Sequence, residues 1–246
     1  NTAIAFYAGA MAGKCLLDAD PAGRSVPALQ HSTYRLHDVP ICPLSLVNKF
    51  GESAVITNVF DDERAEDWVR ALAAVSQNTI AVCDHVHPVS ALRGMLIDGA
   101  ISYAERMGRA FLRTRASGGD CVSAVCRESG GKFVAKGEIL SNEWYTEAGY
   151  TFGTMEIGSG EDIYRIWYQN ENIIMWKNGA YFCTVPDLIC VFNDRDAEPQ
   201  LNPYAEKGCR VSVAVLPAPK EWTTERGLSV FGPRSFGHDI EWTPFC

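Results

Sequence analysis

Residues 18–24, Asp-Ala-Asp-Pro-Ala-Gly-Arg, place two carboxylates and a guanidinium close together in the sequence. Two neighbouring carboxylates could hold a metal ion, or could raise each other's pKa and act as acid and base. Arg24 could bind a carboxylate group through two parallel hydrogen bonds. Alternatively, Asp18 and Asp20 cap backbone N–H groups in a tight turn, and Arg24 pairs with one of them.

A second candidate is residues 84–87, Asp-His-Val-His, which follow a predicted strand at residues 79–83. The two imidazoles of a His-x-His sequence point to the same side of an extended chain, and such a pair suits zinc. Amidohydrolase barrels carry such a pair, but they need about 250 residues of regular βα repeats, whereas this chain changes to β structure halfway. The alternative is that these residues cap a helix that begins at Pro88, so the metal is left open.

Polar residues interrupt a strongly apolar stretch at residues 169–172, Gln-Asn-Glu-Asn, between Trp167-Tyr168 and Ile173-Ile174. A carboxylate in the interior of a sheet needs hydrogen-bond partners, which makes this segment a third candidate. The alternative is a polar edge or a bulge.

The fourth candidate lies near the C-terminus, where residues 232–239 read Gly-Pro-Arg-Ser-Phe-Gly-His-Asp. His238 and Asp239 are weak candidates for a catalytic pair, because neighbouring residues on a strand point to opposite faces. A loop that docks on the other domain is an equally good interpretation.

Composition and missing motifs exclude several classes of protein. The chain has 22 Lys and Arg against 30 Asp and Glu, a formal net charge of −8, and neither half has a basic face, which argues against nucleic-acid binding. No apolar run reaches the roughly 20 residues of a membrane span. The nine scattered cysteines favour small buried side chains in a reduced, cytoplasmic protein over a disulfide framework. No dinucleotide-binding, Walker A, nucleophile-elbow or His-Glu-x-x-His motif occurs, so no cofactor is assigned.

The elements that must position these residues alternate in the first half of the chain. Helical periodicity and capping residues predict helices over residues 2–14, 61–76, 88–97 and 101–112. Short apolar runs predict strands over residues 15–17, 41–47, 54–57 and 79–83. This βα rhythm indicates an α/β layer.

The second half has a different pattern, with a period of two and many aromatic residues from Gly131 onward. Residues 173–185 predict a hairpin, because Asn178-Gly179 suits a two-residue turn. We therefore predict an α/β domain over residues 1–116 and a β-rich domain, barrel-like or sandwich-like, over residues 117–246.

Several segments together resemble one family. Residues 18–24 with Pro27-Ala28-Leu29-Gln30 resemble its Asp-Ala-Asp-Gly-x-Gly-Arg-x-x-Pro-Glu-Leu-Gln motif. Three later segments resemble its second half: residues 184–191, Leu216–Pro219 with Trp222–Thr224, and residues 232–239. The family is the S-methyl thiohydantoin desulfurase-like proteins, which are often encoded beside, or fused to, hydantoinase and oxoprolinase subunits. The resemblance extends from about Ala12 to Asp239.

The resemblance implies an α/β domain with a distinct β-rich domain, and a small cyclic amide or thio-amide as substrate. By similarity, the first motif supplies Asp18, Asp20 and Arg24 as catalytic residues. The residues that would bind substrate are Gln30, Glu171, Asn172, Asp187, Arg234 and Asp239.

The chain departs from the family pattern in ways that bear on the site. Pro21 stands where glycine is usual and Ala28 where glutamate is usual, and either change could weaken a site there. His85 and His87 match no feature of the family. Family members also carry a segment before the position of Asn1, and the chain begins without Met, so we expect the α/β part to be incomplete.

The leading hypothesis is a hydrolase or desulfurase that binds a five-membered cyclic imide, or its S-methyl derivative, at the junction of the domains. Asp18 or Asp20 would orient or activate water for attack on the ring carbon. Arg24 or Arg234 would stabilise the developing negative charge.

The rival hypothesis is a non-catalytic accessory subunit that docks on a hydantoinase or oxoprolinase partner. Its interface anchors would be five aromatic residues near the C-terminus: Trp222, Phe231, Phe236, Trp242 and Phe245. A small-molecule binding module without turnover is a third interpretation. We also expect the chain to form a homo-oligomer.

Overall fold

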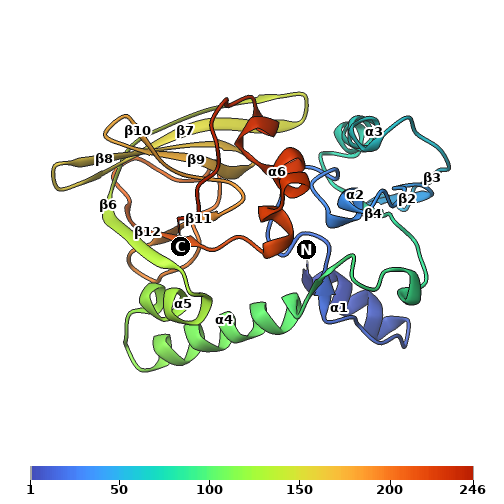
Figure 1. Ribbon diagram of the computed structural model, residues 1–246, viewed down its shortest axis with the longest axis horizontal. Coiled ribbons are helices and arrows are strands. Elements are labelled where there is room, and N and C mark those ends of the chain that lie inside the picture. Colours follow the sequence, from blue (N-terminus) through green and yellow to red (C-terminus); the bar gives the residue numbers. More distant parts are fainter. Residues whose placement is uncertain (1, 246) are drawn as a thin grey trace.

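The computed structural model describes residues 2–245 and has two differently built parts (Figure 1). The first part mixes helices with short strands. The second is dominated by one curled, half-barrel sheet of seven antiparallel strands. This confirms the predicted fold class, an α/β part followed by an all-β part, while the expected boundary at residue 117 stays a prediction.

The first part contains two small antiparallel sheets. Its elements are α1 (Thr2–Met11), β1 (Ala19–Asp20), α2 (Thr33–Leu36), β2 (Leu44–Asn48), β3 (Ser53–Ile56), α3 (Asp62–Val75), β4 (Ile80–Cys83), the 3₁₀ turn η1 (Val89–Ala91), β5 (Ile97–Asp98), α4 (Ala100–Ala116) and α5 (Cys121–Ser129). One sheet has the strand order β3-β2-β4, and the other pairs β1 with β5. As predicted, α3 begins after Asp61, whose side chain accepts a hydrogen bond from the backbone N–H of Arg64. The helix packs Ala65 and Val69 against the three-stranded sheet.

Two predicted elements of the first part are wrong. Residues 15–17 form no strand, and Leu16 and Leu17 are exposed. The helix expected over residues 88–97 is only the turn η1, because Gly94 leaves the helical region with φ +75° and the run before it is too short to nucleate a helix. Because the strand pairs here are antiparallel, the rule that ligands gather at the carboxyl edge of a parallel sheet does not apply to Asp18 and Asp20.

The second part is built around the seven-stranded sheet, whose order is β10-β9-β8-β7-β6-β12-β11. Its elements are β6 (Lys132–Glu147), β7 (Tyr150–Ser159), β8 (Asp162–Gln169), β9 (Glu171–Lys177), β10 (Ala180–Thr184), β11 (Leu188–Asn193), β12 (Arg210–Leu216), η2 (Lys220–Thr223), α6 (Glu225–Phe231) and η3 (Pro233–Phe236). The predicted hairpin is confirmed, since Asn178 and Gly179 both take positive φ between β9 and β10. Every second residue in the middle of β7 and β8 faces the core of this sheet: Met155 and Ile157 on β7, and Ile166 and Tyr168 on β8, are fully buried.

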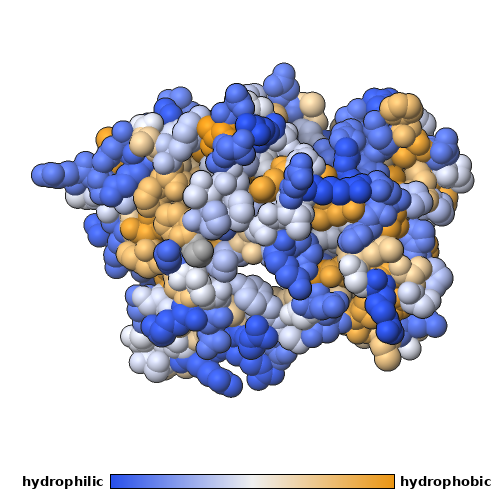
Figure 2. Space-filling view, in the orientation of Figure 1, coloured by the Kyte–Doolittle hydropathy of each residue, from blue (hydrophilic) through white to orange (hydrophobic). Residues whose placement is uncertain are grey.

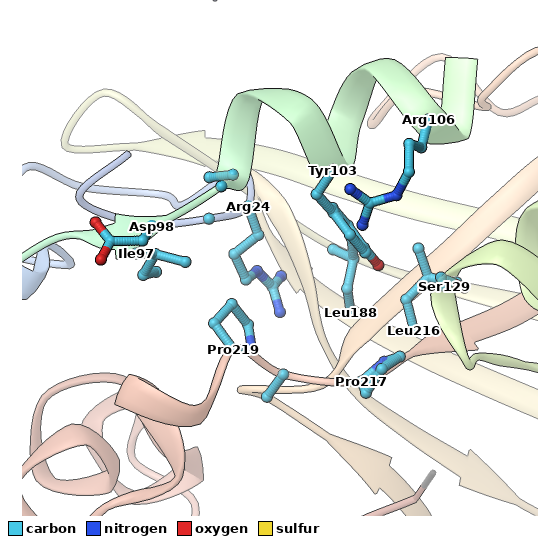
Figure 3. Close-up of a pocket in the computed structure, with 14 residues that line it drawn as sticks. Arg24, Ile97, Asp98, Tyr103, Arg106, Ser129, Leu188, Leu216, Pro217 and Pro219 are labelled. Carbon is cyan, nitrogen blue, oxygen red and sulfur yellow. The ribbon is translucent and has the colours of Figure 1, made fainter. Parts of the chain in front are cut away.

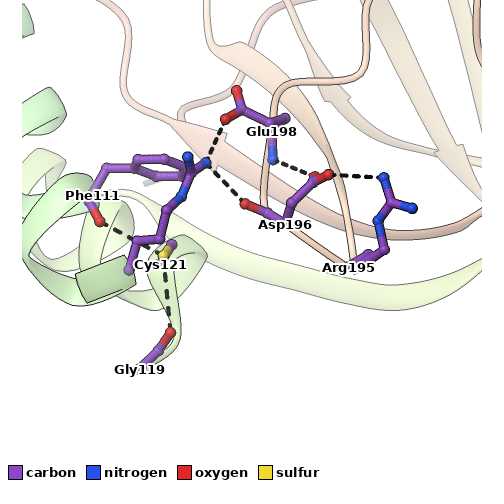
Figure 4. A network of polar contacts seen from close by, with 7 residues as sticks. Phe111, Gly119, Cys121, Arg195, Asp196 and Glu198 are labelled. Carbon is purple, nitrogen blue, oxygen red and sulfur yellow. Dashed lines mark hydrogen bonds and ion pairs between the residues drawn. The ribbon is translucent and has the colours of Figure 1, made fainter. Parts of the chain in front are cut away.

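A helical layer that was only partly predicted connects the two parts. The long helix α4 was expected, whereas α5, which Asp120 caps through a 3.0 Å hydrogen bond from the Ser123 N–H, was not. Near the end of α4, the Arg115 Nη2–H donates to the Asp196 carbonyl at 3.0 Å, and the guanidinium also pairs with the Glu198 carboxylate (Figure 4). Exposed ion pairs contribute at most about 1 kcal/mol, so this contact orients α4 more than it stabilises the fold.

Several apolar side chains remain on the surface of the first part. Figure 2 shows apolar patches on the side of the molecule that carries α1 and the three-stranded sheet. On α1, Ile4, Tyr7 and Met11 are 65%, 68% and 72% exposed. Within residues 2–245, no helix is both long enough and apolar enough to cross a membrane.

The cysteines follow the sequence-based expectation only in part. The eight that the structure describes form no disulfide bond with one another. Cys121, Cys126 and Cys183 are buried as expected, but Cys15 and Cys83 are exposed. Cys246 lies outside the described residues.

Candidate functional site

Residues 18–34, called the motif segment below, cross from the first part of the molecule to the second. The segment starts at β1 and ends in α2, and side chains from both sides hold it in place. The indole N–H of Trp222 donates to the Ala22 carbonyl at 2.8 Å. The Ser25 hydroxyl donates to Oε1 of Glu171 at 2.7 Å. The motif segment is therefore docked on the large sheet and on the helices that follow it.

The two aspartates of the motif segment both accept hydrogen bonds from the backbone. Asp18 accepts from the backbone N–H and the hydroxyl of Ser102 in the first turn of α4, at 2.8 and 2.5 Å. The hydroxyl bond, followed by the backbone bond, holds the pKa of Asp18 below its usual value. Oδ1 of Asp20 accepts from the N–H groups of Ala22 and Gly23. The tight-turn alternative therefore describes Asp20, whereas Asp18 caps the first turn of a helix distant in the sequence.

Arg24 does not pair with either of these aspartates. Its Nη1–H group donates to the carbonyls of Pro186 and Asp187, at 2.8 and 2.9 Å, and its guanidinium lies 5.0 Å from the centre of the Phe231 ring. Burial lowers the pKa of Arg24 to about 10. Its Nη2 atom is buried without a hydrogen-bond partner. Arg24 thus joins the motif segment to the turn before β11.

Asp187 and Asn172, two of the predicted substrate-binding residues, bond to the chain itself. Oδ1 of Asp187 accepts from the Ala218 N–H at 3.0 Å, and Oδ2 accepts from the Trp242 indole at 3.0 Å and the Phe245 N–H at 3.2 Å. The amide of Asn172 donates to the Ile189 carbonyl at 3.0 Å. Glu171 lies nearby through its bond to Ser25, so the structure brings Arg24, Glu171, Asn172 and Asp187 together around the start of β11.

The remaining predicted residues lie elsewhere. Arg234 is exposed, and it pairs with Asp239 at 3.1 Å and with Glu241 at 2.7 Å. Asp239 is itself 93% exposed. Gln30 lies in the motif segment, and its Oε1 atom is buried without a hydrogen-bond partner.

A first cavity, called the junction cavity below, lies between the motif segment, α4 and the end of β12. It has a volume of about 460 Å³. Its polar groups include Arg24, Tyr103 and Arg106, and its apolar wall includes Leu188 and Pro219. Figure 3 shows Tyr103 and Arg106 reaching from α4 towards the strand ends that carry Leu188 and Leu216.

A second cavity, called the His85 cavity below, lies against another stretch of the motif segment. Its volume is about 380 Å³. It is walled by the motif segment, by α3 and β4, and by the two residues after β4; its polar lining residues are His31, Ser32, Tyr34, Glu66, Arg70, Asp84 and His85.

The His85 cavity stands out for buried polar atoms that lack partners. Within the described residues, these atoms include Oγ of Ser32, Nδ1 of His31 and Nε2 of His85. Each buried polar atom without a hydrogen bond costs about 1–3 kcal/mol. Polar cavities of this kind are where bound water or a ligand would offset that cost. The sequence had suggested only two roles for His85, as a zinc ligand or as part of a helix cap.

Two family models match the chain. The model of the S-Me-THD-like N-terminal domain matches residues 1–58, and that of the S-Me-THD-like C-terminal domain matches residues 60–245. The chain belongs to the S-Me-THD-like family. This confirms the family that the sequence motifs had indicated.

The fold of this S-Me-THD-like chain also has a counterpart among solved structures. An X-ray crystal structure of a protein from Chromobacterium violaceum is similar with a TM-score of 0.74 and 22% sequence identity, over 97% of this chain and 68% of that chain. At this identity the likeness shows the fold alone. No curated protein matches the chain.

The departures from the S-Me-THD-like motif both fall on one cavity. Pro21 and Ala28, which stand where glycine and glutamate are usual, line the His85 cavity. Ala28 is 6% exposed, so a longer side chain at this position would enter a closely packed wall. The motif segment therefore shapes this cavity in particular.

The zinc interpretation of residues 84–87 finds no supporting set of ligands. Among residues 2–245, no three His, Cys, Asp or Glu side chains are grouped so as to hold a metal ion. His85 instead has a single carboxylate partner, Asp84, with Nδ1 and Oδ1 2.8 Å apart.

Proposed function

We propose that this chain hydrolyses a small cyclic amide of the hydantoin type, with an S-methyl thiohydantoin as its substrate class. Water would add to the ring carbon that carries the methylthio group. The carbon–sulfur bond then breaks, methanethiol leaves with a proton, and the ring carbon becomes the carbonyl of a hydantoin. The step needs no oxidant or reductant. Membership in the S-Me-THD-like family supports this substrate class.

One observation carries the location of the ring, which we place in the His85 cavity. Ser32 and His85 each have a buried polar atom without a partner, and both residues line this cavity. A hydantoin ring carries N–H and C=O groups on its rim and flat apolar faces, which suits unpaired polar atoms between apolar walls. The volume of about 380 Å³ falls within the range of small-molecule sites.

The motif residues take distinct roles in this proposal. Arg24 acts by positioning, because its guanidinium holds two carbonyls of the turn before β11. Asp20 takes both of its backbone hydrogen bonds on Oδ1, which leaves Oδ2 to orient the attacking water. Asp18, bonded to Ser102, fixes the start of α4 against β1.

The experiment compares two variants that fill one cavity each. Turnover of S-methyl thiohydantoin is followed by trapping methanethiol with a thiol reagent. Val26→Trp fills the His85 cavity and is expected to lower kcat/KM by about tenfold or more, because the ring would lose its space. Ala100→Trp, in the wall of the junction cavity, is the matched control and is expected to leave turnover within about twofold.

The outcomes separate the parts of the proposal. The opposite pattern would place the ring in the junction cavity. A wild-type chain that releases no methanethiol, and opens no hydantoin ring, would overturn the proposed reaction.

A second candidate function, an accessory subunit of a hydantoinase or oxoprolinase partner, is favoured by the exposed apolar residues of α1. Of the five anchors expected from the sequence, Trp222 and Phe231 cannot serve it, because they are fully buried inside the chain. Phe236, Trp242 and Phe245 are half-buried. Co-purification with such a partner, lost on Tyr7→Glu, would support this function. The same variant followed by gel filtration tests the expected homo-oligomer.

A further inference from the structure

Asp84 and His85 form a hydrogen-bonded pair directly after β4, at the wall of the His85 cavity. Oδ1 of Asp84 lies 2.8 Å from Nδ1 of His85. An ionised carboxylate only accepts hydrogen bonds, so Nδ1 carries the hydrogen and donates it. The lone pair of the neutral ring is then on Nε2, which is buried and has no partner. This is the arrangement in which a histidine accepts a proton from a third group.

The surroundings of His85 hold its ring in one orientation. The ring of Tyr34 stacks on it, with 4.3 Å between ring centres and 17° between the planes. The backbone N–H of His85 donates to the Ile41 carbonyl at 3.2 Å. His85 also has φ +45°, a conformation that residues other than glycine rarely adopt and that often marks functional sites. The side chain is 2% exposed, so bulk water does not reach it freely.

Three other charged side chains near His85 come from helix α3. From α3, Glu66 and Arg70 form an ion pair with 2.5 Å between Oε1 and Nε. The guanidinium of Arg70 also donates to the carbonyls of Gly149 and Pro27. Asp62, also on α3, is close enough to interact electrostatically with His85. The carboxylates of Asp84 and Asp62 can therefore stabilise a transient imidazolium on His85.

We propose that His85, oriented by Asp84, is the general base of the His85 cavity and takes the proton from the water that attacks the ring. This inference rests on the proposed function for its substrate. The water oxygen forms a bond to the ring carbon while its proton moves to Nε2. When the carbon–sulfur bond breaks, the imidazolium returns that proton to the departing methanethiolate, so the base is regenerated. The second proton of the water moves from the new C–OH group to the ring nitrogen that was double-bonded to this carbon as the carbonyl forms, so atoms and electrons balance.

The first experiment removes the base and then replaces it. His85→Gly suits the positive φ at this position, because glycine adopts it without strain. We expect kcat for S-methyl thiohydantoin to fall by about 100-fold or more, with KM changed by less than about threefold. Added imidazole should restore kcat with a saturable dependence on concentration, which a purely structural role of His85 would not produce. His37→Gly, at an exposed histidine, is the matched control.

Two further measurements test the role of Asp84. Asp84→Asn should lower kcat because the wrong imidazole tautomer is favoured, and Asp84→Glu should recover part of the loss. In wild type, log(kcat/KM) should fall with unit slope at acidic pH. In imidazole-rescued His85→Gly, the acidic fall in log(kcat/KM) should instead follow the pKa of the added base. The titratable and charged groups that surround His85 are Asp84 on its own segment, Tyr34 on α2, and Asp62, Glu66 and Arg70 on α3.

A measurement without substrate keeps the two proposals distinguishable. Long-range ¹H–¹⁵N correlation of the full-length wild type should show His85 with Nδ1 protonated and Nε2 bare at neutral pH. A His85→Gly chain that keeps wild-type kcat, or an Nε2-protonated ring in wild type, overturns the assignment of His85. A wild type that turns over no ring substrate, with the Nδ1–H ring intact, overturns the proposed function instead and leaves the geometry of the pair standing.

Discussion

His31 and His85 are both buried on the wall of one cavity, and they differ in what surrounds them. The His31 ring lies 5.0 Å from the Phe231 ring and 5.2 Å from the Phe236 ring. Burial, followed by the positive charge of Arg24, lowers the pKa of His31 to about 4. His85 has a carboxylate beside Nδ1 instead. We call these two surroundings the His31 end and the His85 end of the cavity: the first keeps its imidazole neutral, and the second places a carboxylate beside it.

The largest effect on stability is expected at the His31 end. The folded-state pKa of about 4 lies below the ordinary value of 6.5, so the unfolded chain binds the proton first as pH falls. His31 should therefore remove about 3 kcal/mol of unfolding free energy between pH 6.5 and pH 4. Urea unfolding of wild type and His31→Gln at both pH values measures this difference. His37→Gln is the exposed control, and an equal pH dependence in wild type and His31→Gln would contradict the assignment.

Arg24→Met should have the next largest effect. The variant loses two hydrogen bonds from a charged donor to the Pro186 and Asp187 carbonyls, which should cost about 2 kcal/mol. It also removes the positive charge that helps to lower the pKa of His31. The stability lost between pH 6.5 and pH 4 should therefore be smaller than in wild type. Unfolding of the double variant Arg24→Met/His31→Gln measures the interaction between the two residues. If the two changes in unfolding free energy simply add, Arg24 does not influence His31.

Tyr34→Leu tests whether the stacked ring of Tyr34 shields His85. Loss of the stacked ring should cost about 1 kcal/mol and should open one face of His85. Carbethoxylation of His85, followed by peptide mass spectrometry, should become faster in this variant. Tyr34→Phe keeps the ring and serves as the control. Equal reactivity of His85 in wild type and Tyr34→Leu would mean that the stack does not shield it.

The sequence predicted the elements that local patterns determine. The Asn178-Gly179 turn and the Asp61 cap each depend on residues a few positions apart, and both formed as expected. Helix 88–97 was wrong because Gly94 ends it, and α5 was missed because it lies beyond residue 117, where a β-rich domain was expected to begin. The periodicity of a segment does not reveal what packs against it.

The candidate site was harder to predict, because its contacts join distant parts of the chain. The spacing of Asp18, Asp20 and Arg24 suggested a carboxylate pair with an arginine. The structure instead turns these side chains towards Ser102, the following turn and the Pro186 carbonyl. Asp84 and His85 are neighbours in sequence, yet their pairing depends on the positive φ at His85 and on the stacked Tyr34. Neither condition could be read from the residues 84–87 alone.

Asp20 is where the smallest effect on stability is expected. It directly precedes Pro21, which lines the His85 cavity. Asp20→Asn keeps a side-chain oxygen for the Ala22 and Gly23 N–H groups, so it should cost only about a few tenths of a kcal/mol. If Oδ2 also orients the attacking water, kcat should still fall by about tenfold. Urea unfolding and the methanethiol assay on the same preparation measure both quantities. Unchanged stability together with unchanged kcat would leave Asp20 as a turn cap alone, and would assign the proton chemistry of this cavity to Asp84 and His85 without help from the motif carboxylates.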